Sequence, residues 1–257
     1  MTTQRPVTAA LVLIGDELLT AKVDDTNGRH AIRAMREAGI ALHELVYVRD
    51  DVPRLAATVR RLAEETDIVI TSGGIGPTHD DRTVEAVAAA FDVPLVENEQ
   101  LAERIRRVAK GRPERLKAFA RLALLPEGAS FVDDVSLRWP VYLARNVYML
   151  PGLPDLFVAQ LPVVLDRHRG ARARCVTLYL TWGEGRLVEP LDTVVEAWPD
   201  VAFGSYPVMN ADYRTRVTVE SVDAARVDRA VSDLLAQIDD DALVRIEREG
   251  DSTDGAG

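Results

Sequence analysis

The chain has 257 residues, 47% of them hydrophobic and 28% charged, and its formal net charge is −10. This length holds one large domain or a large and a small one, and the hydrophobic content suffices for a folded core. The apolar runs are too short to span a bilayer, the acidic balance disfavours nucleic acid as a partner, and the chain starts without the apolar stretch of a signal peptide. These features predict a cytoplasmic globular protein that binds neither membranes nor nucleic acid.

Strand and helix patterns alternate along the first part of the chain. The runs at residues 7–14 and 67–71 are typical of buried strands, the latter covered on both faces, and residues 40–48 form a further strand pattern. Residues 27–38 and the segment from Pro53 onward have apolar side chains at helical spacing. Strands that alternate with helices in this way predict a parallel sheet with right-handed crossovers and helices on both faces.

The third of these strands runs into a glycine-rich turn, residues 72–78 with the sequence S-G-G-I-G-P-T. Glycine accepts positive φ and lets a ligand approach the main chain. N–H groups where a turn enters a helix favour phosphate, so the N–H groups of Gly73, Gly74 and Gly76 are candidates to hold one. The alternative is that these glycines only make a tight connection between strand and helix.

Two adjacent carboxylates, Asp80 and Asp81, follow the glycine turn. We expect one of them, or Thr78, to cap the next helix. Beside a phosphate the two acids would repel the ligand unless a cation lay between them. The pair therefore indicates a divalent metal.

Acidic pairs also follow the first two strands, as Asp16-Glu17 and Asp50-Asp51. For each pair alone, a helix cap or a solvated turn is the commoner explanation. In parallel sheets, however, ligands bind at the carboxyl ends of the strands, and here acids follow three of them. The pattern predicts a site with oxygen ligands for Mg²⁺ or Mn²⁺, with Co²⁺ as a further option.

Further elements complete the first domain, which we expect to span residues 1–170. The patterns predict helices at 99–109, 114–121 and 153–167, and strand-like runs at 122–125, 130–132 and 141–150. Trp139 lies between two of these runs and can either pack in the core or stack on a ligand ring.

From residue 171 the order of elements changes. The expected sequence is strand, helix, two strands either side of a turn at 207–210, helix and strand. This β-α-β-β-α-β order is that of the ferredoxin-like split unit, so residues 171–248 are predicted to form a smaller α+β domain. Residues 249–257 are polar and glycine-rich, and we expect a flexible tail there.

Residues 71–83, with the sequence T-S-G-G-I-G-P-T-H-D-D-R-T, resemble the signature of the competence/damage-inducible protein A family, within the molybdopterin-binding-domain superfamily. The similarity continues at residues 14–19, 25–27, 48–51 and 150–154. Residues 146–157 and 203–207 are similar, more particularly, to the N-terminal domain of eukaryotic FAD synthases and its stand-alone bacterial relatives.

The resemblance implies a three-layer α/β/α domain and a metal-dependent nucleotide pyrophosphatase that acts on a dinucleotide such as FAD or ADP-ribose. It makes Asp81 and Asp50 the expected metal ligands, with Asp80 as a further catalytic residue. The residues expected to contact the ligand or its phosphate are Gly73, Gly74, Gly76, Thr78, Ser72, Gly15, Glu17 and Asn27. Because family members commonly self-associate, the resemblance also implies a homo-oligomer.

Two other functions stay open. One is molybdopterin binding or adenylyl transfer in molybdenum-cofactor biosynthesis, but enzymes of that branch typically carry Thr in place of Ile75 and Arg in place of Asp80. An acid in place of that arginine reverses the charge beside the phosphate, which argues against the same transfer chemistry. The other is a ligand-binding module without catalysis, which would have little use for unpaired carboxylates beside a glycine loop.

Overall fold

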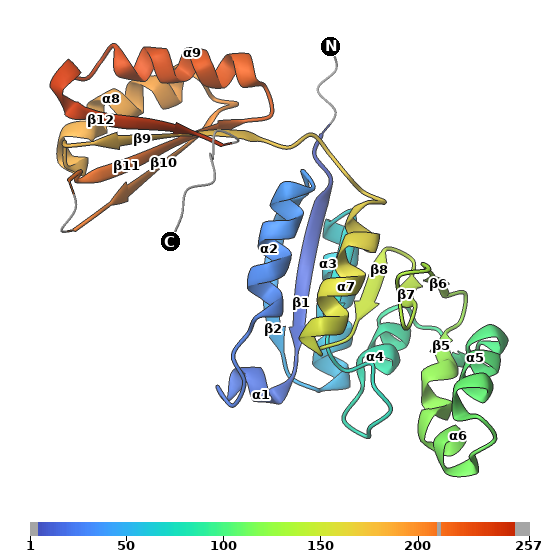
Figure 1. Ribbon diagram of the computed structural model, residues 1–257. Coiled ribbons are helices and arrows are strands. Elements are labelled where there is room, and N and C mark those ends of the chain that lie inside the picture. The colour runs from blue at the N-terminus through green and yellow to red at the C-terminus, as the bar shows by residue number, and fades with distance from the viewer. Residues whose placement is uncertain (1–4, 210–211, 250–257) are drawn as a thin grey trace. The chain divides into compact units, whose positions relative to one another are not determined.

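The computed structural model of the protein describes residues 5–209 and 212–249 (Figure 1). These residues form two compact units, with the boundary between Ala171 and Arg172. Residues 250–257 of the expected tail and Asn210 of the expected turn lie outside the described residues. Every helix in the described ranges is too short or too polar to cross a membrane.

The first unit is built on a six-stranded sheet with the order β2-β1-β3-β8-β7-β6. β2, β1, β3 and β8 run parallel, whereas β7 and β6 are antiparallel to their neighbours. The strands are β1 (Thr8–Ile14), β2 (Ala41–Val48), β3 (Ile68–Ser72), β6 (Ser130–Val132), β7 (Val141–Ala144) and β8 (Val147–Leu150).

Helices and two short strands surround this sheet. The helices are α1 (Asp16–Leu19), α2 (Asn27–Glu37), α3 (Val52–Glu65), α4 (Thr83–Ala90), α5 (Glu99–Ala109), α6 (Pro113–Phe119), α7 (Pro154–Leu165) and the 3-10 helix η1 (Ala120–Ala123). The short strands β4 (Leu95–Glu97) and β5 (Leu124–Pro126) pair with each other.

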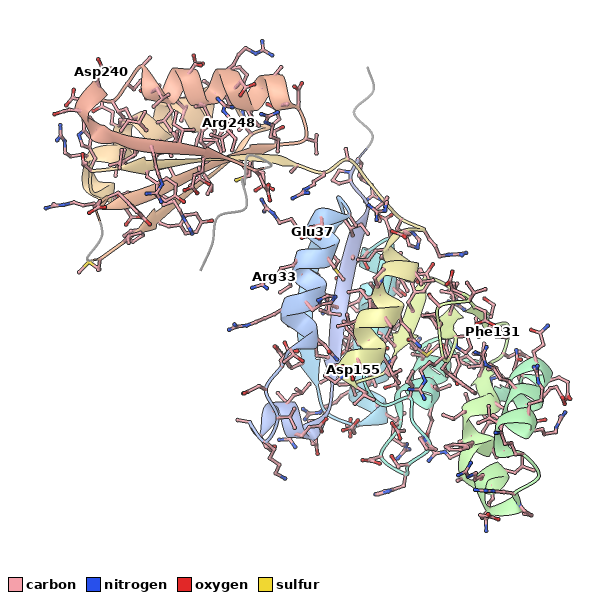
Figure 2. The ribbon with its side chains drawn as sticks, in the orientation of Figure 1. Arg33, Glu37, Phe131, Asp155, Asp240 and Arg248 are labelled. Atoms are coloured by element: carbon pink, nitrogen blue, oxygen red, sulfur yellow. The ribbon has the colours of Figure 1, made fainter. Side chains whose placement is uncertain are left out.

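Helices cover both faces of the large sheet (Figure 1). α2 and α7 pack on one face, where Leu11 of β1 joins a core with Met35, and α3 and α4 pack on the other, where Val12 joins a core with Leu55. Because successive side chains of a strand point to opposite faces, each face takes every second residue of β1. On α2 the outward side carries polar residues such as Arg33 (Figure 2). The predicted three-layer α/β/α fold is confirmed.

One expected strand is a hairpin instead. The run at residues 141–150 divides into β7 and β8, with Arg145 at φ 52° in the turn between them. Asn146 Nδ2 fixes this turn by donating to the carbonyls of Ala63 and Thr66 at 3.0 and 3.1 Å. These contacts with distant segments hold Arg145 in a backbone conformation that arginine rarely adopts. The pattern of apolar residues carries no information about such contacts, so it could not predict the turn.

The second unit has the predicted β-α-β-β-α-β order. Its elements are β9 (Arg174–Leu180), α8 (Glu184–Ala197), β10 (Ala202–Pro207), β11 (Thr215–Ser221), α9 (Ala224–Leu235), the 3-10 helix η2 (Asp240–Ala242) and β12 (Leu243–Arg248). The sheet is antiparallel with the order β10-β11-β9-β12, and α8 and α9 share its hydrophobic core. A separate antiparallel domain of the ferredoxin-like kind is confirmed.

Candidate functional site

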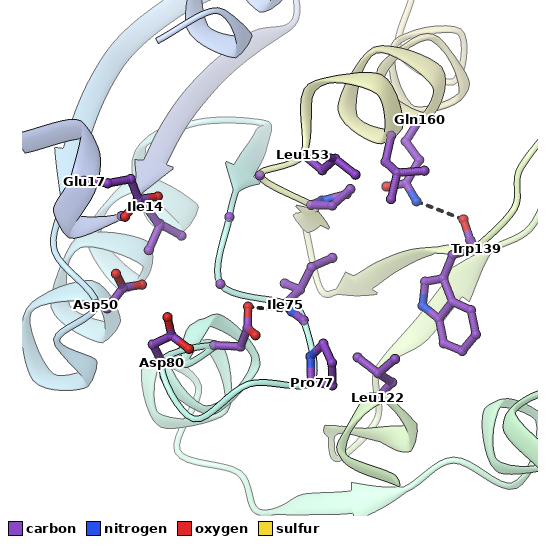
Figure 3. Close-up of a pocket in the computed structure, with 18 residues that line it drawn as sticks. Ile14, Glu17, Asp50, Ile75, Pro77, Asp80, Leu122, Trp139, Leu153 and Gln160 are labelled. Atoms are coloured by element: carbon purple, nitrogen blue, oxygen red, sulfur yellow. Dashed lines mark hydrogen bonds between the residues drawn. The ribbon is translucent and has the colours of Figure 1, made fainter. Parts of the chain in front are cut away.

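A cavity of about 500 Å³ lies at the carboxyl ends of β1, β2 and β3 (Figure 3). Its lining contains eight of the residues predicted to form the site: Gly15, Glu17, Asp50, Gly73, Gly74, Gly76, Asp80 and Asp81. Three strand ends thus contribute to one cavity, as expected for a parallel sheet.

One end of the cavity is acidic. Asp50, which follows β2, lies here with Glu17 and Asp80 (Figure 3), and its Oδ2 accepts a hydrogen bond from the Asp16 amide at 3.2 Å. Partial burial raises the pKa of the Asp50 carboxyl, and the neighbouring charges of Glu17 and Asp80 raise it further, against the effect of this hydrogen bond. These repelling carboxylates would be stabilised by a divalent cation.

Asp81 holds the glycine loop together. Its Oδ1 accepts a hydrogen bond from the Gly76 amide at 2.6 Å, and its Oδ2 accepts one from the Thr78 amide at 2.8 Å and another from the Thr78 hydroxyl. A carboxylate has about four acceptor positions, so these bonds leave roughly one for a metal. Thr78 therefore belongs to the frame of the loop and lies outside the lining of the cavity.

The helix after the loop, α4, begins only at Thr83. The Thr83 amide donates to the carbonyl of Gly74 at 2.9 Å, and its hydroxyl donates to the carbonyl of Gly73 at 2.8 Å. Main-chain carbonyls of the loop thus hold the first turn, and no side chain caps it. The predicted capping of this helix by Thr78, Asp80 or Asp81 is wrong.

Two of the three amides predicted to hold phosphate already have partners. Gly73 donates to the last carbonyl of β8 at 3.0 Å, and Gly76 donates to the aspartate described above. Gly73 also has φ 110°, and a Cβ there would lie 2.4 Å from the carbonyl oxygen of Ile14, so close packing alone requires glycine at this position. In the described chain the Gly74 amide has no hydrogen-bond partner, which leaves one N–H available instead of three.

Asn27 and Ser72 lie behind the loop, outside the lining of the cavity. Asn27 Nδ2 donates to Ser72 Oγ at 3.0 Å and to the carbonyl of Gly152 at 2.8 Å. The turn at Gly152 packs against the loop, since a Cβ there would lie 3.2 Å from Gly73 Cα. Asn27 therefore positions the loop and the start of α7, and a direct contact of Asn27 with the ligand stays a prediction.

The other end of the cavity is apolar and is closed by Gln160 (Figure 3). Leu122, Leu153 and Trp139 line it, so Trp139 reaches the site as well as the core. Gln160 is not among the site residues predicted from the sequence. The available signal was a polar residue on the apolar stripe of α7, beside the buried Leu161.

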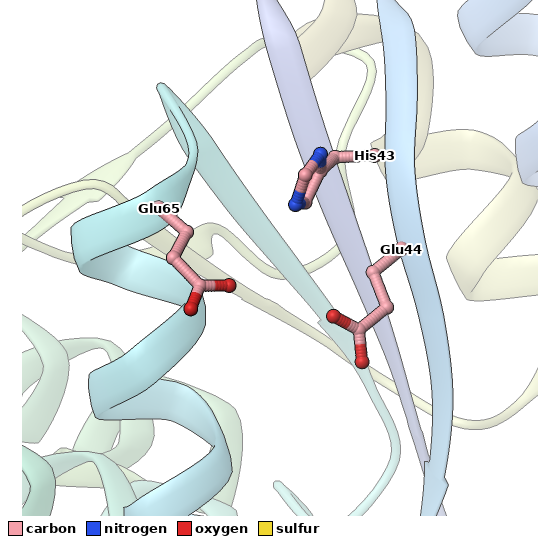
Figure 4. Close-up of side chains that lie close together, drawn as sticks. All are labelled: His43, Glu44 and Glu65. Carbon is pink, nitrogen blue, oxygen red and sulfur yellow. The ribbon is translucent and has the colours of Figure 1, made fainter.

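Another acidic group lies away from the cavity. It consists of His43, Glu44 and Glu65 (Figure 4). Within the described ranges, this is the one group of three His, Cys, Asp or Glu side chains whose potential metal-ligand atoms all lie within 4.8 Å of one another. Arg61 already pairs with both carboxylates of this set, because its guanidinium lies 2.8 and 2.9 Å from the Glu44 oxygens and 2.7 Å from Glu65. We interpret it as a surface ion-pair network.

The fold and this cavity define a ligand-binding α/β domain, and comparison with known proteins gives its family. Residues 10–168 match the family model "Probable molybdopterin binding domain", and residues 172–247 match "FAD synthase, middle domain". The first match covers more than half of the chain and includes every residue that lines the cavity. The protein belongs to the molybdopterin-binding-domain family, and its second unit is similar to the middle domain of FAD synthases.

Individual relatives confirm the resemblance to competence/damage-inducible protein A and to FAD synthase. A CinA-like protein of Geobacter metallireducens is 36% identical over 188 residues, which cover 67% of this chain and 44% of that protein. A probable FAD synthase of Caenorhabditis elegans is 28% identical over 254 residues, which cover 88% of this chain and 49% of that protein. This chain thus spans about half the length of these relatives.

A solved structure has the same fold in the first unit. The crystal structure of CinA from Thermoplasma acidophilum, a protein described as having unknown function, superposes with a TM-score of 0.56 at 26% identity. The match covers 63% of this chain and 99% of the other.

Proposed function

We propose that this protein is a nucleotide pyrophosphatase that hydrolyses a dinucleotide-type substrate, FAD or ADP-ribose, with the help of a divalent cation. The observation that carries the proposal is the division of the cavity into an end with Glu17, Asp50 and Asp80 and an apolar end at Trp139. A pyrophosphate with its cation suits the first end, and a heteroaromatic ring suits the second. The similarity to FAD synthases supports a flavin nucleotide as the substrate.

The acidic end fits a cation that is held partly by the substrate. In the described part of the chain, no three carboxylates at this end bring ligand oxygens within 4.8 Å of one another. Mg²⁺ commonly takes only one or two protein carboxylates and completes its coordination with water and substrate phosphates. Asp50 and Asp80 would hold it, and Asp81 can add its remaining acceptor position. When bound, such a cation neutralises charge on phosphate oxygens and activates water.

The remaining groups of the site bind and orient the substrate. The Gly74 amide, which has no partner among the described residues, would donate to a phosphate oxygen, and Asp81 keeps the loop in the shape that presents this amide. The apolar lining at Leu122 and Trp139 excludes water from a bound ring. In the reaction the P–O–P bond breaks and water adds across it, so that FAD yields FMN and AMP.

The test is incubation of the full chain with FAD, ADP-ribose and other dinucleotides in Mg²⁺, Mn²⁺ or Co²⁺, followed by chromatographic separation of the products. We expect cleavage that stops in EDTA and in Asp50→Asn. Asp51→Asn is the matched control, because Asp51 accepts from the Arg54 amide at 3.0 Å as the cap of α3 and does not line the cavity. If the folded protein cleaves none of these substrates with any of the metals, the proposal is wrong.

The same assay separates hydrolysis from adenylyl transfer. Incubation with FMN, ATP and Mg²⁺ yields FAD and pyrophosphate only if the site transfers an adenylyl group. We expect no FAD to form, because Asp80 stands where enzymes of the transfer branch typically carry an arginine, and an aspartate cannot pair with the triphosphate as that arginine would.

A further inference from the structure

The apolar end of the cavity contains a buried hydrogen-bond acceptor without a partner. Gln160 on α7 is 2% exposed, lines the cavity, and donates through Nε2 to the carbonyl of Trp139 at 2.8 Å. Its Oε1 is buried and accepts no hydrogen bond from the described chain. Of the described residues with such an orphan side-chain atom, Gln160 is the one in the cavity lining. Buried polar atoms are nearly always paired, so this acceptor indicates a donor on a ligand.

The orientation of this amide is fixed by its surroundings. Turning the amide over would set Oε1 against the carbonyl oxygen of Trp139, so that two acceptors would face each other. Trp139 is itself held in place, because its Nε1 donates to Tyr142 Oη at 2.8 Å and Tyr142 Oη donates to the carbonyl of Leu122 at 2.7 Å. The amide of Gln160 therefore keeps this orientation, and its Oε1 stays without a donor from the described chain.

We infer that Gln160 reads the edge of a planar nitrogen heterocycle by accepting a hydrogen bond from an N–H group of that ring. Leu122, Leu153 and Trp139 line the same end of the cavity as Gln160, and Leu153 exposes 60% of its surface, which a bound ring would cover (Figure 3). A flat ring with a donor on its edge satisfies both the apolar lining and the orphan oxygen. The imide N–H of a flavin and the amino group of adenine are both donors of this kind.

This inference rests on the proposed function for its cavity, and a separate experiment tests it. The full chain is titrated calorimetrically in EDTA with two matched pairs of ligands that lack phosphate: riboflavin with 3-methylriboflavin, and adenosine with purine riboside. The second member of each pair lacks the donor. We expect one donor-bearing ligand to bind about tenfold tighter than its partner, the effect of one hydrogen bond to a buried acceptor. The pair that shows the difference identifies the ring.

In the variant Gln160→Met the side chain has a similar size but no amide acceptor. For the pair that shows the difference, we expect the ratio of the two dissociation constants to fall below about twofold in this variant. Equal affinities within both pairs of the wild-type protein would overturn the inference, even if the variant failed to fold. It would also be overturned by a ratio that survives in a folded Gln160→Met, or by no binding of any of the four ligands at millimolar concentration. A clear ratio without cleavage of FAD, ADP-ribose or any other dinucleotide tested would instead refute the proposed hydrolysis and leave the ring site supported.

Discussion

Asp81 Oδ1 lies 2.6 Å from the amide nitrogen of Gly76, across the glycine loop that forms one wall of the cavity. Sequence motifs mark Asp81 as a metal ligand, yet this contact makes it a structural residue of the loop as well. Loss of activity in a variant of Asp81 therefore has two possible origins, and a stability measurement separates them.

For Asp81→Ala we expect the free energy of unfolding to fall by about 1–3 kcal/mol, because the amides of Gly76 and Thr78 lose their acceptor. Asp80→Ala is the matched comparison, since its side chain is 65% exposed, and its stability should change by less than about 0.5 kcal/mol. Both variants should lose turnover. Urea unfolding followed by circular dichroism makes the measurement, and equal stability of the two variants would contradict the role of Asp81 in the loop.

Divalent cation should raise the melting temperature of the wild-type protein, because a ligand that binds only the folded state stabilises it. We expect this increase with Mg²⁺ or Mn²⁺ to disappear in Asp50→Asn, which removes a carboxylate from the acidic end. The increase should persist in Asp51→Asn, because the Asp51 carboxylate caps α3 and does not line the cavity. A thermal shift of the same size in all three proteins would place the cation elsewhere.

Asp67 should give stability that depends on pH. Its carboxylate accepts hydrogen bonds from the Thr8 amide at 2.8 Å and from Arg5 at 2.6 Å, and these contacts lower its pKa below the ordinary 3.8. Because the carboxyl pKa is lower in the folded protein, the unfolded chain binds the proton more readily. The stabilisation that Asp67 gives the folded state is therefore complete above pH 3.8 and is lost as the pH falls through the folded-state pKa.

We therefore expect Asp67→Asn to melt below the wild-type temperature at neutral pH, and the gap to narrow as the pH falls below 3.8. Melting curves of the two proteins over a series of pH values make the comparison. A gap that stayed constant over the acidic range would show that the charge of Asp67 is not what stabilises the start of β1.

Gly73→Ala should be far more damaging than Gly128→Ala. Both residues have positive φ, 110° and 78°, so each substitution has a backbone cost of about 1–2 kcal/mol. Only at Gly73 would the new Cβ also meet another atom, the carbonyl oxygen of Ile14 at 2.4 Å, whereas Gly128 has nothing within 4 Å. Unfolding midpoints in urea test the difference, and equal losses would mean that the loop moves easily away from β1.

Much of this architecture could be predicted from the sequence. Non-alternating apolar runs such as residues 67–71 mark strands covered on both faces, and topology then brings the acids that follow them to one edge. Glu17, Asp50 and Asp80 accordingly line one cavity. These predictions succeed because the periodicity of side chains and the direction of parallel strands are local properties of the chain.

The remaining features depend on contacts between distant segments. The hairpin turn at Arg145 is held by Asn146, whose partners lie about 80 residues earlier. The amides of Gly76 and Thr78 donate to Asp81, whereas sequence spacing alone predicts that amides of this loop are free to bind a ligand. The carbonyl of Trp139, 21 residues earlier, fixes the amide of Gln160 in the orientation that leaves Oε1 without a donor from the described chain.

The position of β1 has a consequence for the time scale of motion at the site. Its residues from Ala9 to Leu13 are buried between two hydrophobic cores, and its amides pair with neighbours in the middle of the sheet. Such amides exchange with solvent hydrogen only when the whole domain opens, whereas the unpartnered amide of Gly74 should exchange without any unfolding. We therefore expect the site to join a slowly exchanging strand to a rapidly exchanging loop, and protection gained at Gly74 alone on adding a phosphate ligand would report that the phosphate has bound there.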